Sequence, residues 1–366
     1  MSGTLIRLTL KRIVKTAFFL CSARLRPFSR LIPVSDLGKW VIGREMREIS
    51  FLASKLGIKI GSPWLAVHGS QQAVFIGNHF ALLLSDNWFQ SNHRLATAYF
   101  HGKPGQGVSE FDRCFDSLGK RHKFIHRVQV SCKEMQQVVL SSGIDHEKVH
   151  LIPIGINLDY FYRQTAASRR SARDRFNVPQ NAFVVGSFQK DGDGWGEGLK
   201  PKMIKGPDVF IEAMSLLKKS VKSLVVLLSG PARGYVKEGL QAAGVPYIHH
   251  QLEEYSDVGC LYQALDVYVV ASREEGGPKS VLESMASGVP LVSTRVGQAT
   301  DLMKHEANGF LADIEDANEI ARWATHVFEK GSALLPMIHA GRVTAERNCY
   351  NAQLPLWEKF FDGFVE

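Results

Sequence analysis

Cysteine is scarce in this chain. Its 366 residues contain five cysteines, which lie far apart at positions 21, 114, 132, 260 and 349, and no C-x-x-C motif. An odd number of scattered cysteines indicates neither a disulfide framework nor a zinc knuckle. Because disulfides are rare where thiols are kept reduced, this usage favours a cytoplasmic protein.

Acidic residues and long apolar runs are missing from the first 35 residues. The apolar run of residues 16–23 is too short to span a bilayer, and no small-residue cleavage site marks a signal peptide. The basic residues of this segment are interleaved with Leu, Ile, Val and Phe; they are Arg7, Lys11, Arg12, Lys15, Arg24, Arg26 and Arg30. This pattern predicts a basic amphipathic segment on an anionic membrane surface. The alternative is a helix packed on the N-terminal domain with its basic face in water.

The net charge of +8 is accompanied by no RNA- or DNA-binding motif, so we expect no nucleic-acid partner. With 45% apolar and 22% charged residues, the chain has a globular composition and is long enough for two domains. Strand-like apolar segments at residues 73–76, 95–100, 182–188 and 224–229 are separated by helical patterns. This alternation predicts an α/β fold with parallel sheets.

The most informative stretch runs from Asp266 to Gly297 and reads DVYVVASREEGGPKSVLESMASGVPLVSTRVG. Residues 266–272 are apolar and β-branched, which predicts a buried strand. The two Gly and one Pro of residues 274–279 predict a loop. Apolar spacing over residues 280–287 predicts a helix with Ser280 at its cap, followed by a second strand. Ligands of parallel α/β sheets bind where a strand ends and a helix begins, as here.

Two carboxylates, Glu275 and Glu283, lie in this loop and in the second turn of this helix. The loop folds back over the helix start, so both side chains can reach one ligand about the length of a nucleotide sugar. Between them, the amides of Gly276, Gly277 and Lys279 and the positive helix end suit a diphosphate. Carboxylates accept hydrogen bonds from sugar hydroxyls and repel phosphate. The alternative is a capped helix whose acids are solvated, but the glycine-rich loop and flanking strands favour the ligand site.

The segment EGGPKSVLESMASGVPLVST resembles the E-x7-E signature of the retaining, GT-B-fold glycosyltransferases of family 4. The resemblance extends from about Arg127 to Gly309. It implies two Rossmann-like domains with parallel sheets that face each other across a cleft. It also implies that Glu275 contacts the donor sugar and that Glu283 binds the ribose of the nucleotide.

The same resemblance gives the domain layout. Residues 1–160 are expected to form an N-terminal, acceptor-binding Rossmann-like domain, which includes the basic segment. Residues 161–349 are expected to bind the nucleotide sugar, and residues 350–366 to form a helix that crosses back to the first domain.

A long, glycine-rich and cationic segment follows the predicted strand at 182–188. Lys205 and Gly206 end this segment and open the next helix. In the resembling family, a Lys-Gly pair and an earlier Arg grip the donor diphosphate. Lys205 matches the lysine, but Ser187 occupies the arginine position, and Lys190 is the candidate for the missing charge. The alternative is a surface loop with scattered lysines.

His101 ends the predicted strand at 95–100 and begins another glycine-rich loop. It is the best match to the histidine that lines the donor sugar in the resembling family, and a surface histidine is the alternative. His79 and Asp86 are weaker candidates for site residues, and they would face the acceptor. The sequence His146-Glu147-Lys148-Val149-His150 matches the H-E-x-x-H zinc motif, but the strand predicted over residues 149–152 excludes the helix that this motif needs.

Taken with the resemblance, these residues imply a retaining, hexosyltransferase-type glycosyltransferase of surface polysaccharide or glycolipid synthesis. Its partners would be a nucleotide-sugar donor and a saccharide or lipid-linked acceptor. Neither a cofactor nor a metal is expected, because the family is largely metal-independent. A sugar-nucleotide epimerase of the same fold would isomerise the donor without an acceptor. A non-catalytic relative would bind the nucleotide sugar alone.

Overall fold

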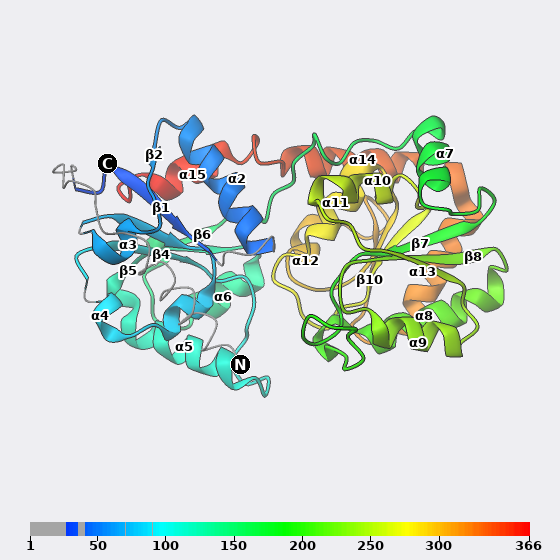
Figure 1. Ribbon diagram of the computed structural model, residues 1–366, viewed down its shortest axis with the longest axis horizontal. Helices are drawn as coiled ribbons and strands as arrows, with labels where there is room; N and C mark the ends of the chain where they lie inside the picture. The colour runs from blue at the N-terminus through cyan, green and yellow to red at the C-terminus, as the bar shows by residue number, and fades with distance from the viewer. Residues whose placement is uncertain (1–26, 36–40, 70, 90) are drawn as a thin grey trace. The chain divides into compact units, whose positions relative to one another are not determined.

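The computed structural model describes residues 27–35, 41–69, 71–89 and 91–366 (Figure 1). The chain forms two compact units. The N-terminal unit comprises the chain up to Ile154 together with Gln353–Glu366, and the C-terminal unit comprises Gly155–Ala352. Most of the predicted basic segment, residues 1–26, lies outside the described residues. Within the described part of the chain, no helix combines the length and apolarity needed to cross a membrane.

A six-stranded, all-parallel sheet forms the centre of the N-terminal unit, with strand order β2-β1-β3-β4-β5-β6. Its strands are β1 (Arg30–Val34), β2 (Lys59–Ile60), β3 (Ala73–Ile76), β4 (Arg94–Ala98), β5 (Ile125–Val130) and β6 (Val149–Leu151). Its helices are α2 (Val41–Lys55), α3 (Leu65–His68), α4 (Asp86–Phe89), α5 (Ser109–Arg121), α6 (Lys133–Leu140) and α15 (Leu354–Phe361).

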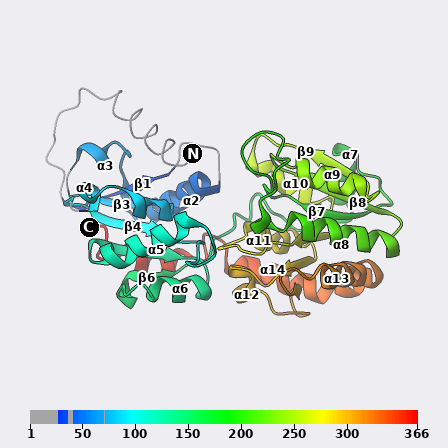
Figure 2. The ribbon, with the colours of Figure 1, turned by 90° about the horizontal axis from the view of Figure 1, so that it is seen from below.

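Helices cover both faces of this sheet, with α2 and α15 on one side and α5 and α6 on the other (Figures 1 and 2). The C-terminal helix α15 is an integral part of this unit. Its Phe360 ring packs 5.2 Å from the ring of Phe75 on β3. Arg127 on β5 donates hydrogen bonds of 3.1 Å to the Phe360 carbonyl and 2.7 Å to the Asp362 carbonyl.

A second six-stranded, all-parallel sheet forms the centre of the C-terminal unit, with strand order β12-β11-β10-β7-β8-β9. Its strands are β7 (Phe183–Ser187), β8 (Leu224–Ser229), β9 (Tyr247–His250), β10 (Val267–Val270), β11 (Leu291–Thr294) and β12 (Phe310–Ala312). Chain order reverses between the neighbours β7 and β10, so the topological switch point lies there. In open α/β sheets, ligands bind beyond the carboxyl ends of the strands at this point.

Two apolar cores, one on each face, hold helices to this sheet (Figures 1 and 2). Helices α8 (Pro207–Ser220), α9 (Gly234–Ala242) and α13 (Ala317–Lys330) cover one face. The other face is covered by helices α7 (Ala166–Arg175), α10 (Val258–Tyr262), α11 (Lys279–Ser287), α12 (Gln298–Leu302) and α14 (Leu335–Arg347). The predicted α/β fold with parallel sheets is confirmed.

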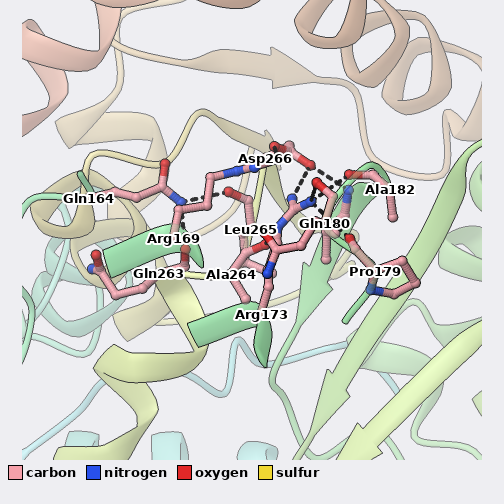
Figure 3. A network of polar contacts seen from close by, with 11 residues as sticks. Gln164, Arg169, Arg173, Pro179, Gln180, Ala182, Gln263, Ala264, Leu265 and Asp266 are labelled. Atoms are coloured by element: carbon pink, nitrogen blue, oxygen red, sulfur yellow. Dashed lines mark hydrogen bonds and ion pairs between the residues drawn. The ribbon is translucent and has the colours of Figure 1, made fainter. Parts of the chain in front are cut away.

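A buried polar network fixes the amino ends of β7 and β10 (Figure 3). Asp266, which precedes β10, accepts hydrogen bonds of 2.7 Å from Arg173 and 2.7 Å from the Val184 amide of β7. The fully buried Arg173 also donates to the carbonyls of Ala182 and Ala264 at 2.8 and 3.1 Å. The network therefore joins α7 to the two strands whose opposite ends flank the switch point.

One local prediction is corrected by the structure. The helix after β10 begins at Lys279, with Pro278 rather than Ser280 at its cap. Proline has a fixed φ and cannot donate an amide hydrogen, so a helix can begin directly after it. In the H-E-x-x-H segment, residues 146–148 form one 3₁₀ turn and His150 lies on β6, so the segment is not an α-helix.

Candidate active site

The loops that follow β7 and β10 meet at the switch point of the C-terminal sheet. Lys205, at the end of the first loop, donates a 2.5 Å hydrogen bond from Nζ to Oε1 of Glu275 in the second. Ser272 donates a 2.9 Å hydrogen bond to the same oxygen. The Glu275 side chain is 13% exposed and that of Lys205 is 25% exposed. The cation predicted for the diphosphate and the carboxylate predicted for the sugar therefore lie together.

Gly206 brings these two loops together. Its φ is 59°, in the left-handed region, and a Cβ there would lie 1.9 Å from the carbonyl oxygen of Ala271. Only glycine fits this approach of α8 to the end of β10. The turn places the Lys205 side chain directly beside the loop of residues 271–278.

The glycine-rich loop before α11 is held by the segment after β11. The Gln298 amide donates a 2.9 Å hydrogen bond to the carbonyl of Gly276. A Cβ on Gly297 would lie 2.3 Å from that same carbonyl oxygen, so only glycine fits there. The amides of Gly276 and Gly277 donate no hydrogen bond among the residues that the structure describes. These N–H groups and the helix start form a place where an anion can bind.

Glu283 lies in α11, where 6% of its surface is exposed. The hydroxyl of Tyr255 donates to its Oε1, and the hydroxyl of Tyr262 donates a 3.0 Å hydrogen bond to its Oε2. Burial raises the pKa of Tyr262 well above its usual value, so this hydroxyl remains protonated and can donate. The two phenols thus hold and orient the Glu283 carboxylate.

Lys279 lies at the start of α11 between two aromatic rings. Its Nζ is 5.6 Å from the ring centre of Tyr255 and 5.5 Å from that of Tyr350. It also donates a 2.8 Å hydrogen bond to the Tyr350 hydroxyl. Tyr255 thus contacts the ammonium group of Lys279 through its ring and the carboxylate of Glu283 through its hydroxyl.

The long segment after β7 forms a hairpin on the surface of the C-terminal unit. Gly192 and Pro201 form an antiparallel bridge across it. Lys190 lies at its base, with Nζ 4.5 Å from the ring centre of Trp195, which is 68% exposed. Partial burial and the nearby Lys202 lower the pKa of Lys190. Asp193, in the same hairpin, opposes this shift.

His101 lies in the N-terminal unit, beyond the carboxyl end of β4. Its ring centre is 4.9 Å from that of His79, which follows β3, and 5.5 Å from that of Phe111. Burial lowers the pKa of His79 to about 3, and its Nε2 has no hydrogen-bond partner among the described residues. A neutral, buried imidazole thus packs edge-on against the histidine predicted to face the sugar.

The structure places the predicted residues in three groups. The first group comprises Lys205 and the residues on the loop after β10 and on α11. Lys205 hydrogen-bonds Glu275, and Gly276, Gly277, Lys279 and Glu283 follow Glu275 on that loop and helix. Lys190 contacts the hairpin, and His101 belongs to the other unit. Sequence reasoning missed Ser272, Tyr255 and Tyr262, which hydrogen-bond the two carboxylates, because no spacing motif links them to Glu275 or Glu283.

Part of the chain matches a known protein family and several curated proteins. Residues 198–330, less than half of the chain, match the family described as "Glycosyl transferases group 1". A D-inositol 3-phosphate glycosyltransferase of Xylanimonas cellulosilytica is 28% identical over 196 residues, which are 50% of this chain and 44% of that protein. One of Streptosporangium roseum is 28% identical over 211 residues, 52% of this chain and 43% of that protein. The matches therefore span less than half the length of these curated relatives.

Solved structures match over a larger part of the chain. Anabaena HepE in complex with UDP-glucose has a TM-score of 0.74 at 16% identity and covers 91% of this chain and 99% of HepE. Sucrose-phosphate synthase from Thermosynechococcus elongatus has a TM-score of 0.68 at 17% identity, with 86% of this chain and 78% of that chain covered. The chain therefore has the GT-B fold of glycosyltransferases, and its residues 198–330 carry the sequence pattern of the group 1 glycosyl transferases.

Proposed function

We propose that this protein is a glycosyltransferase that moves a sugar from a nucleotide diphosphate sugar to a saccharide or lipid-linked acceptor with retention. The arrangement of Lys205, Glu275 and the Gly276–Gly277 amides at the switch point of the C-terminal sheet carries the proposal. It offers a cation from the loop after β7, and a hydrogen-bond acceptor and anion-binding amides from the loop after β10. A UDP-sugar is the first donor to test, because HepE binds UDP-glucose.

In this proposal the donor diphosphate lies on the amides of Gly276 and Gly277 and on Lys205. As the bond to the sugar breaks, negative charge grows on the leaving phosphate. Prearranged amides, the N-terminus of α11 and the ammonium groups of Lys205 and Lys190 stabilise that charge without a metal ion. Glu283 binds ribose hydroxyls, and Glu275 and His101 contact the sugar. Transfer then proceeds by front-face displacement, in which the leaving phosphate assists the acceptor hydroxyl.

Thermal unfolding with a panel of nucleotide diphosphate sugars tests this proposal. A ligand present at 100 times its Kd stabilises the folded state by about 2.7 kcal/mol. We expect one member of the panel to raise the Tm, and its sugar to appear on a saccharide or lipid-linked acceptor. Isomerisation of that sugar without an acceptor would identify an epimerase instead, and no shift with any member would contradict the proposal.

Replacing Glu283 by glutamine is expected to weaken binding of the stabilising nucleotide diphosphate by about 1.5–3 kcal/mol, because a hydrogen bond to a charged group is lost. Glutamine has nearly the same shape and still accepts one tyrosine hydroxyl, so the fold is kept. Titration calorimetry measures the change. Tyr262→Phe is the matched control, since it removes one donor to Glu283 but leaves the carboxylate in place. Unchanged affinity in the glutamine variant would show that Glu283 does not bind the nucleotide.

We also propose that the basic N-terminal segment holds the protein peripherally on the cytoplasmic face of a membrane, close to a surface-polysaccharide or glycolipid acceptor. Each Lys or Arg near an anionic surface contributes about 1 kcal/mol. The protein should therefore co-sediment with anionic vesicles at low salt and be released at high salt. Changing Lys11, Arg12 and Lys15 to Glu should abolish co-sedimentation. Wild-type protein that stays in the supernatant at low salt would contradict this role.

A further inference from the structure

A buried arginine reaches the position where the resembling family has its diphosphate-binding arginine. Ser187 occupies that position here, at the carboxyl end of β7. Arg233, from the loop after β8, donates a 2.7 Å hydrogen bond to the Ser187 carbonyl and a 3.1 Å hydrogen bond to the Ser187 hydroxyl. It also donates to the Ser229 carbonyl at 2.9 Å. One guanidinium group therefore joins the ends of the two neighbouring strands β7 and β8.

The same guanidinium group holds the base of the hairpin that follows β7. Its Nε lies 3.0 Å from Oδ1 of Asp191, and both side chains are almost completely buried. Burial raises the pKa of Asp191 although Arg233 opposes that shift. The contact is an ion pair and not a hydrogen bond, because neither Nε of Arg233 nor either carboxylate oxygen of Asp191 has a hydrogen-bond partner among the described residues. Removing one partner of a buried ion pair leaves an uncompensated charge. The first residue of the hairpin is thus fixed to the strand ends.

Backbone contacts extend this attachment along the hairpin. The Lys202 amide donates a 2.7 Å hydrogen bond to the Asp191 carbonyl. The Gly234 amide, directly after Arg233, donates a 2.7 Å hydrogen bond to the Glu197 carbonyl. Arg233 and its neighbours therefore clamp the segment that begins beside Lys190 and ends at Lys205.

We infer that Arg233 is a positioning residue for the diphosphate site: it fixes the hairpin that carries Lys190 and leads to Lys205 to the ends of β7 and β8, next to Ser187. The inference rests on the proposed function. Arg233 is inaccessible to a ligand, because its side chain is 0% exposed. It acts through the loop: its planar fork donates hydrogen bonds to both strand ends while its Nε lies beside Asp191, an arrangement that a lysine cannot reproduce.

Arg173 provides a matched control, because it lies at the amino ends of the central strands of the same sheet, opposite the carboxyl ends that Arg233 contacts. Its side chain is also 0% exposed and is also paired with an aspartate, Asp266. Arg233→Met and Arg173→Met should both lower the Tm. Titration calorimetry with UDP-glucose should show at least a 10-fold higher Kd for Arg233→Met only. A similar Kd in both variants would overturn the inference.

The conservative variant separates geometry from charge. Arg233→Lys keeps a buried cation but loses the fork, so we expect it to recover only part of the affinity. Full recovery of the wild-type Kd would show that charge alone matters and would overturn the positioning role. This variant also decides the question if Arg233→Met does not fold.

Amide hydrogen exchange tests the inference without a nucleotide. In the Arg233 variants, residues 188–206 should exchange faster than in the wild type, while the loop at 295–298 is unchanged. In Arg173→Met, residues 188–206 should keep their wild-type rates. If wild-type protein does not bind UDP-glucose, the proposed donor is wrong, and the exchange rates still decide whether Arg233 fixes the hairpin. Unchanged exchange of residues 188–206 would contradict the role.

Discussion

Replacing Glu275 by glutamine is expected to lower the turnover of the sugar donor by about 100-fold or more without weakening the binding of the nucleotide diphosphate. Glu275 is proposed to contact the sugar, whose charge changes in the transition state, and removing such a contact typically costs about 100- to 1,000-fold in rate. Its Oε1 also accepts the 2.5 Å hydrogen bond from Lys205. Glutamine releases that ammonium group for the diphosphate, so the Kd of the nucleotide should stay equal or fall.

Steady-state kinetics and titration calorimetry together measure this separation of rate and affinity. Ser272→Ala is the control, because it removes the other hydrogen bond to Oε1 and leaves the carboxylate charge intact. Its turnover should fall less than that of the glutamine variant, because the carboxylate and its charge remain although one hydrogen bond to a charged group is lost. Full turnover of the glutamine variant would show that Glu275 is only a structural acid.

Replacing Arg173 by methionine is expected to lower the free energy of unfolding of the C-terminal unit by about 3–5 kcal/mol, because one partner of a buried ion pair is removed. The variant also leaves the Ala182 and Ala264 carbonyls without the donor that they have in the wild type. Urea unfolding measures the loss.

Arg169→Met is the matched control for this prediction. Arg169 pairs with the same Asp266 at 2.8 Å, but its side chain is 31% exposed. An exposed ion pair contributes about 1 kcal/mol or less. Equal losses in the two variants would show that the pairing with Asp266, rather than the burial of Arg173, determines stability.

Much of the fold could be predicted from local sequence. Residues 73–76 and 291–294 are short apolar runs between polar or glycine-rich segments, and both are strands. The start of α11 was misplaced because Ser280 is a good capping residue, whereas Pro278 fixes the turn earlier. A side-chain cap is a weak signal when a proline lies just before it.

The site could be predicted only where its residues are close in sequence. Glu275, Gly276, Gly277 and Glu283 share one loop and helix, so their spacing indicated a ligand site. The contact of Glu275 with Lys205 depends on β7 lying next to β10, which is a property of strand order. Local patterns do not specify strand order.

The buried partners could not be predicted for a related reason. Tyr262 and Arg233 look like ordinary core or surface residues in the sequence, and only the fold brings them to Glu283 and Ser187. Ser187 indicated that this chain lacks the arginine of the resembling family at that position. The sequence did not indicate that Arg233 would contact Ser187.

A crystal structure with the nucleotide diphosphate sugar selected by the thermal panel tests the central claim most directly. We predict that the diphosphate lies on the amides of Gly276 and Gly277 and on Nζ of Lys205, and that the ribose hydroxyls reach Glu283. In this complex, the 2.5 Å hydrogen bond between Lys205 and Glu275 should be broken. A nucleotide bound elsewhere, with the Lys205–Glu275 pair intact, would contradict the account.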